Sequence, residues 1–126
     1  NSTDEDLQYA KSYLLYAEED YKAAEAELTV LHPLIAGHVD YYSLLAQVNL
    51  QLAQYNEAKS LYRLLLDEDP KNPKLWLGLA LSLKALNRTD DATVAFKQAL
   101  QFKGLSVSVI AYIDHQLQGV AYSASV

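Results

Sequence analysis

Histidines, serines and carboxylates are the side chains of this sequence that could take part in catalysis or hold a metal. His32, His38 and His115 stand far apart, and none belongs to a His-Glu-x-x-His pattern that would hold zinc. The serines lack the glycine-flanked turn of a serine nucleophile, and the chain has no cysteine. The carboxylate runs at 18–20 and 67–69 fall at expected helix ends, where solvated side chains are more common than acid–base pairs. We therefore predict no catalytic residue, no cofactor and no metal, and interpret the protein as one that is not an enzyme.

A stripe of tyrosines near the N-terminus could bind a partner rather than react. Tyr9, Tyr13 and Tyr16 recur at spacings of four and three, which places them on one face of a helix. A tyrosine ring offers a rigid apolar surface with a polar tip, so such a stripe can anchor a peptide or a helix. The same stripe could instead pack inside the protein, and the sequence leaves both alternatives open.

The elements that must position these tyrosines repeat along the chain. Ala24, Ala58 and Ala92 are evenly spaced, and the apolar residues around them recur at helical spacing. Their period of about 34 residues, filled with helices, is typical of stacked helix hairpins. The pattern predicts seven helices, near residues 4–17, 20–32, 39–53, 55–68, 73–86, 89–102 and 106–118.

We expect these helices to form one all-α domain over residues 1–118. Because a stacked array leaves an apolar face at its end, the last helix would act as a cap. The three repeats and the capping helix are expected at about 5–36, 39–72, 73–104 and 106–118. The small, polar residues 119–126 predict a frayed tail, with a strand-like or peptide-like arm as the alternative.

The third repeat resembles the tetratricopeptide repeat in the order of its large and small residues. Trp76 and Ala80 stand at the large and small positions of its first helix, and Ala92, Phe96 and Ala99 at the corresponding positions of its second. The other two repeats match at Tyr42, Ala46, Ala58, Tyr62 and Pro70 and at Tyr21, Ala24 and Leu28. The resemblance implies a right-handed superhelix of about three helix hairpins with a C-terminal capping helix, which binds other proteins. We expect Trp76 to be wedged between the second and third repeats.

Residues 40–118 also resemble the C-terminal repeat domain of the MshN family, which serves biogenesis of the mannose-sensitive haemagglutinin type IV pilus. The shared features are the run PKNPKLWLGLALSLKAL at 70–86 and a Gly104-Leu105-Ser106 step before a final helix. In that family a membrane anchor precedes the repeats, so the resemblance implies a periplasmic domain anchored in a bacterial inner membrane. It also implies a scaffold for pilus or related secretion assembly. The alternative is a soluble cytoplasmic chaperone or regulator that holds a client protein.

In a tetratricopeptide array, one face of the first helix of each repeat lines a concave groove. The predicted partner-binding groove consists of Tyr9, Tyr13, Tyr16, Gln47, Lys74, Leu77, Leu81 and Lys84. Some arrays of this family clamp the terminal carboxylate of a peptide with lysine and asparagine side chains. Only Lys74 stands at such a position here, so we reject that mode of binding.

The net charge of −6 lies in the first repeat. Residues 1–27 hold eight acidic side chains against two basic ones, whereas residues 28–126 hold eight of each. This balance argues against nucleic acid, whose phosphates require a basic surface. The acids are either a solvated cap or part of a site for a basic partner, and self-association stays open. We expect a protein or peptide partner.

No apolar run of the sequence is long enough to cross a membrane. Because the sequence starts at Asn1 rather than Met, and inside an expected helical pattern, we also expect an upstream part of the protein.

Overall fold

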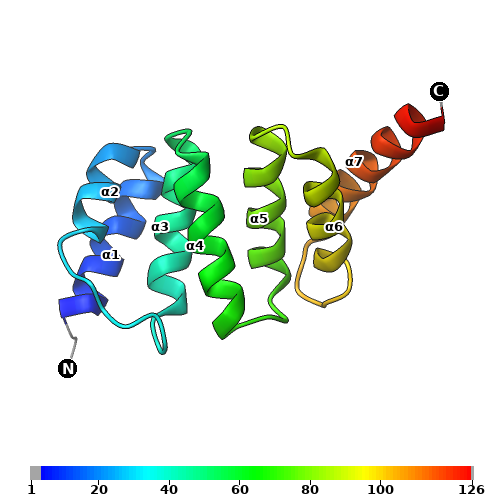
Figure 1. Ribbon diagram of the computed structural model, residues 1–126. Helices are drawn as coiled ribbons and strands as arrows, with labels where there is room; N and C mark the ends of the chain where they lie inside the picture. The colour runs from blue at the N-terminus through cyan, green and yellow to red at the C-terminus, as the bar shows by residue number, and fades with distance from the viewer. Residues whose placement is uncertain (1–3, 126) are drawn as a thin grey trace.

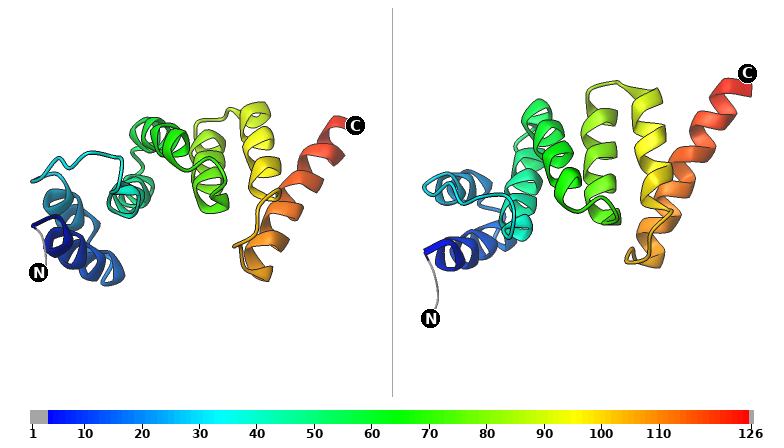
Figure 2. Two further views of the ribbon diagram at one scale, coloured as in Figure 1. Left: turned by 90° about the horizontal axis from the view of Figure 1, so that it is seen from below. Right: turned by 60° about the horizontal axis from the view of Figure 1, so that its bottom comes forward.

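The computed structural model describes residues 4–125, which fold into seven α-helices without a strand (Figure 1). The helices are α1 (Asp4–Ala17), α2 (Tyr21–Leu28), α3 (Val39–Gln51), α4 (Tyr55–Glu68), α5 (Pro73–Ala85), α6 (Thr89–Ala99) and α7 (Val107–Ser125). Each helix packs on the next, and α3 also contacts both α1 and α5. The hairpins α1–α2, α3–α4 and α5–α6 therefore stack side by side, with α7 at the end (Figure 2). The predicted all-α superhelix of three hairpins and a closing helix is confirmed.

The turn within each hairpin has the same backbone geometry. Glu19, Ala53 and Asn87 recur at the same interval as the buried alanines and have positive φ angles of 63°, 59° and 61°. In each turn the amide of this residue donates to the carbonyl three residues earlier, and the next amide donates to the carbonyl five residues earlier. This pair of bonds satisfies the last carbonyls of the first helix in each hairpin. The repeat is thus encoded in the turns as well as in Ala24, Ala58 and Ala92.

Replacing Ala53 with glycine is expected to stabilise the domain by about 0.5–1 kcal/mol. A left-handed conformation costs an L-residue roughly 1–2 kcal/mol, and the extra freedom of glycine in the unfolded chain offsets only part of that relief. Chemical unfolding should show a higher midpoint. Ala26→Gly in the exposed interior of α2 is the control, and it should cost about 1 kcal/mol. A midpoint for Ala53→Gly as low as that of the control would contradict the left-handed assignment.

Helix α2 ends earlier than predicted, at Leu28 rather than near residue 32. The Thr29 hydroxyl donates to the Glu25 and Ala26 carbonyls in the last turn of the helix. From α3, the Tyr41 hydroxyl donates to the Leu28 carbonyl at 2.8 Å. Because this partner is distant in the sequence, helical periodicity alone could not place the end of α2.

The prediction of a frayed tail after residue 118 is wrong, because α7 continues to Ser125. Its C-terminal half extends away from the stack beyond α6 (Figures 1 and 2). The segment contains Gly119 but no proline, and a single glycine weakens a helix by about 1 kcal/mol without breaking it. The preceding helix, α6, stops at Ala99, three residues before the predicted position.

The junction between the second and third repeats is formed by an aromatic ring lying on a glycine. Tyr62 of α4 is 2% exposed. A Cβ atom added to Gly78 of α5 would lie 2.1 Å from the Cζ atom of that ring. Trp76, which was expected to be the wedge, is only half-buried against the same core, and its indole N–H donates to the Pro70 carbonyl at 2.8 Å. Tyr62 therefore fills the junction, and Trp76 closes its edge.

Candidate functional site

Three hollows adjoin one another along the layer formed by α1, α3 and α5. The apolar hollow, about 440 Å³, has walls that include Tyr16, Leu77 and Leu81. The central hollow, about 570 Å³, and the acidic hollow, about 500 Å³, share Tyr9, Asp40 and Asp69. The central and apolar hollows share Gln47, Lys74 and Gly104. Because neighbouring hollows have walls in common, they form one continuous depression, which we call the groove.

The structure brings together seven of the eight residues predicted for the partner-binding groove. Tyr9 and Tyr13 line the central hollow, and Tyr16, Leu77 and Leu81 line the apolar hollow. The two polar residues Gln47 and Lys74 line both of these hollows. That these residues bind a partner stays a prediction.

Lys84 lies apart from the other seven. Its Nζ atom is 5.7 Å from the centre of the Tyr112 ring of α7. It lines a separate, smaller cavity together with Phe96 and Gln116. The sequence placed Lys84 in the groove because it follows Leu81 by three residues. In the structure α7 packs on α6, and its Tyr112 lies beside the Lys84 ammonium.

The tyrosine stripe both lines the groove and packs on the core. Tyr9 and Tyr16 lie against the small core cluster of α2 and α3, whereas Tyr13 is 55% exposed. Burial raises the pKa of Tyr9, and the nearby Asp40 carboxylate raises it further. Burial is also the main cause of the raised pKa of Tyr16. These phenols therefore stay neutral and can donate hydrogen bonds at physiological pH.

The walls of the apolar hollow include parts that the sequence pattern did not indicate. The connection from α6 to α7 contributes Leu105 and Ser106, and α7 contributes Val109. The ring of Tyr62 forms a further part of the wall, beside Gly78. Gly78 was the signal in the sequence for this part of the wall, because a glycine in the middle of a helix often marks the close approach of another side chain.

Three serine hydroxyls and one imidazole are bonded locally to the backbone. The Ser12 and Ser82 hydroxyls donate to carbonyls four residues earlier, and Ser106 accepts from the Val109 amide at the start of α7. The Nδ1 atom of His38 lies 2.8 Å from the Leu34 carbonyl oxygen. Within residues 4–125, no three histidine or carboxylate side chains are grouped so that they could hold a metal. None of the helices in that part has the length and hydropathy of a membrane span.

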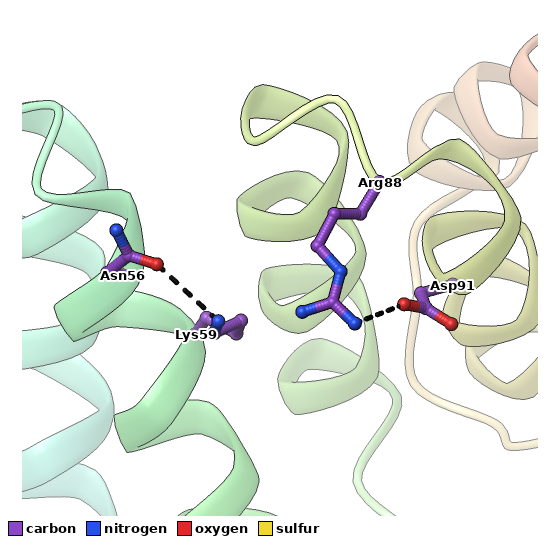
Figure 3. Close-up of polar contacts among 4 residues, drawn as sticks. All are labelled: Asn56, Lys59, Arg88 and Asp91. Atoms are coloured by element: carbon purple, nitrogen blue, oxygen red, sulfur yellow. Dashed lines mark hydrogen bonds and ion pairs between the residues drawn. The ribbon is translucent and has the colours of Figure 1, made fainter.

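Two polar contacts lie at the starts of helices outside the groove (Figure 3). The Lys59 ammonium donates to the Asn56 side-chain oxygen at 3.4 Å, and the Arg88 guanidinium donates to the Asp91 carboxylate at 2.6 Å. The side chains of Arg88 and Asp91 are 45% and 52% exposed. Exposed pairs of this kind stabilise a fold by at most about 1 kcal/mol, so we assign both contacts to the helix starts.

Comparison with known proteins places this fold in a class. The tetratricopeptide repeat family model matches residues 49–104, from the end of α3 through α6. No curated protein sequence matches the chain. The class that fold and groove define is therefore a tetratricopeptide-type helical repeat domain.

Solved structures show the same fold over nearly the whole chain. The type III secretion chaperone SycD of Yersinia enterocolitica, in complex with a peptide of the translocator YopD, has a TM-score of 0.87 at 16% identity, covering 98% of this chain and 97% of that one. A second SycD structure, an alternative dimer, has a TM-score of 0.85 at 16% identity, covering 100% and 98%. The Sgt2 tetratricopeptide domain of Aspergillus fumigatus has a TM-score of 0.80 at 18% identity, covering 98% and 81%.

Proposed function

We propose that this domain is a non-catalytic protein-interaction module whose groove holds a peptide segment of a partner protein. The observation that carries the proposal is the continuous groove, in which an apolar hollow of about 440 Å³ adjoins two more polar ones. Hollows of this kind bury apolar side chains and offer polar groups that orient the bound chain. The similar SycD structure, which holds a peptide of its translocator, supports the same use of the fold here.

Two cellular roles follow from this proposal. The first is a scaffold for assembly of a type IV pilus or a related secretion machine, periplasmic and anchored in the inner membrane. It is supported by the resemblance of the run at 70–86 and of Gly104-Leu105-Ser106 to the MshN family. The second is a chaperone or regulator that holds a client protein, and it is supported by the similarity to SycD over nearly all of both chains. Fractionation of the native protein separates the two, since the scaffold should follow the membrane and the chaperone the soluble fraction.

Filling the apolar hollow is expected to weaken partner binding strongly. Gln51 is exposed and lines that hollow, so the larger ring of Gln51→Trp can occupy it. A partner is first captured from the native source and identified, and its affinity is then measured by titration. We expect Gln51→Trp to weaken binding at least about 10-fold, because a central anchor commonly contributes about 2 kcal/mol or more. Gln118→Trp, exposed on α7, is the control and should bind like the parent.

Tyr13 offers a matched removal experiment, because Tyr13 and Leu64 are both 55% exposed. Tyr13 lines the central hollow, whereas Leu64 of α4 lines none of the three hollows. Tyr13→Ala should weaken binding about 5- to 10-fold, and Leu64→Ala should leave it unchanged. Equal affinity of the folded Gln51→Trp and Tyr13→Ala variants and the parent would move the site out of the groove. Turnover of a substrate by the pure domain would overturn the non-catalytic proposal.

A further inference from the structure

The walls of the groove change from acidic to apolar along the direction of α1 and α3. On α1, Glu5 lines the acidic hollow and Tyr16 the apolar one. On α3, Asp40 lines the acidic hollow and Leu50 the apolar one. Two helices that contact each other thus present the same order of side chains, so the groove has two chemically different ends.

Charge is distributed unevenly between these two ends. The lining of the acidic hollow includes Glu5, Asp40 and Asp69 and contains no lysine or arginine. The central hollow is lined by Asp40 and Asp69 and also by three lysines, Lys71, Lys74 and Lys103. The one charged residue that lines the apolar hollow is Lys74. A basic side chain of a bound peptide is therefore attracted to the acidic end and repelled from the centre, which fixes its position along the groove.

The distance between the two ends follows from helix geometry. Asp40 and Leu50 are ten residues apart on α3, and a rise of about 1.5 Å per residue places them about 15 Å apart along the helix axis. An extended peptide rises about 3.3 Å per residue. Such a peptide spans this distance in about four or five residues, whereas a helical one needs about ten.

We propose that the groove selects an extended peptide in which a large apolar residue stands four or five residues from a lysine or arginine. The apolar side chain enters the hollow lined by Leu77 and Leu81, and the basic side chain lies beside Glu5 and Asp40. This inference rests on the proposed function, because it names the partner class of the same groove. The sequence suggested that the acids of residues 1–27 as a group could form a site for a basic partner. In the structure only two of these eight acids, Glu5 and Asp6, line the groove.

The experiment selects peptides from a random dodecapeptide display library on the full chain. The parent should enrich peptides with an apolar and a basic residue four or five positions apart. The charge variant Glu5→Gln/Asp40→Asn should keep the apolar preference and lose the basic one. The matched control Glu57→Gln/Asp90→Asn should behave like the parent, since it also removes two carboxylates from the first turns of helices but lies outside the three hollows.

An enriched peptide is then synthesised with a fluorophore and titrated by anisotropy. The charge variant should bind it about 3- to 10-fold more weakly at low salt, with a smaller difference at high salt, and the control pair should match the parent. The selected peptides could lose binding to Gln51→Trp and yet carry no basic residue. That result would overturn this inference and leave the proposed function standing. Enrichment at a spacing of about ten would overturn the extended form. If no enriched peptide loses binding to Gln51→Trp, both proposals are overturned.

Discussion

Replacing Gly78 with alanine is expected to destabilise the domain by about 2–3 kcal/mol, although alanine is the better helix former. The added methyl carbon would lie 2.1 to 2.6 Å from three ring carbons of Tyr62. That ring is buried, so it cannot swing into solvent to make room. Either the ring or the whole of α5 must shift, and both movements open the junction between the second and third repeats. Chemical unfolding followed by circular dichroism measures the loss.

Gly119 provides the matched control for this substitution. It also lies within a helix, but a Cβ atom built on it has no neighbour within 4 Å. Gly119→Ala should therefore be neutral or stabilising by up to about 1 kcal/mol. Combining Gly78→Ala with Tyr62→Leu should cost less than the sum of the single changes, because the clash needs the ring. Equal midpoints for Gly78→Ala and Gly119→Ala would show that Tyr62 does not lie on Gly78.

Replacing Ile113 with alanine is expected to cost about 2–4 kcal/mol and to loosen α7 from the array. Ile113 is 0% exposed and belongs to the main core. Among the residues of α7 up to 119, whose burial is described, it is the only one that is fully buried. Val109 and Leu117 pack beside it but are only half-buried. Losing this anchor leaves a cavity next to α6 and exposes the end of the last hairpin. Unfolding midpoints and hydrogen exchange along α6 and α7 report the effect.

Ile110 supplies the comparison within the same helix. It has the same side chain but is 39% exposed, so Ile110→Ala should cost less than about 1 kcal/mol. This pair of variants holds helix propensity and chemistry constant and changes only burial. A loss at Ile110 as large as that at Ile113 would mean that α7 packs on the array through a different face.

The fold was predictable because its determinants are local and repeat. The buried alanines recur at a constant interval, and α5 begins at Pro73, the predicted position. The Asn72 side chain caps this helix by accepting from the Lys74 amide at 3.0 Å. The capping role of the last helix was also predictable, and α7 packs on the core through one face. Ile113 is buried and Val109 and Leu117 pack on the core, whereas Tyr112 stays 38% exposed and contacts Phe96 edge to face.

The remaining features depend on contacts between distant parts of the chain. The end of α2 is set by the Tyr41 hydroxyl, and the position of Lys84 by the ring of Tyr112. The apolar hollow needs a wall from the α6–α7 connection, including Leu105, which lies outside the face predicted from the first helices. A periodic pattern identifies the face of each helix but not what another element places opposite it. The groove was therefore predicted only along the side formed by the first helix of each hairpin.

The ring of Tyr62 belongs to two parts of the molecule at once. One side lies on Gly78 and joins the second repeat to the third, and the same side chain forms part of the wall of the apolar hollow. Anything that fills the hollow therefore holds the ring in place, so occupancy and the stiffness of the superhelix are thermodynamically linked. A ligand at about one hundred times its Kd would add about 2.7 kcal/mol to the stability of the folded state. The amides of α4 and α5 should then exchange more slowly, and the array should flex less about the joint at its middle.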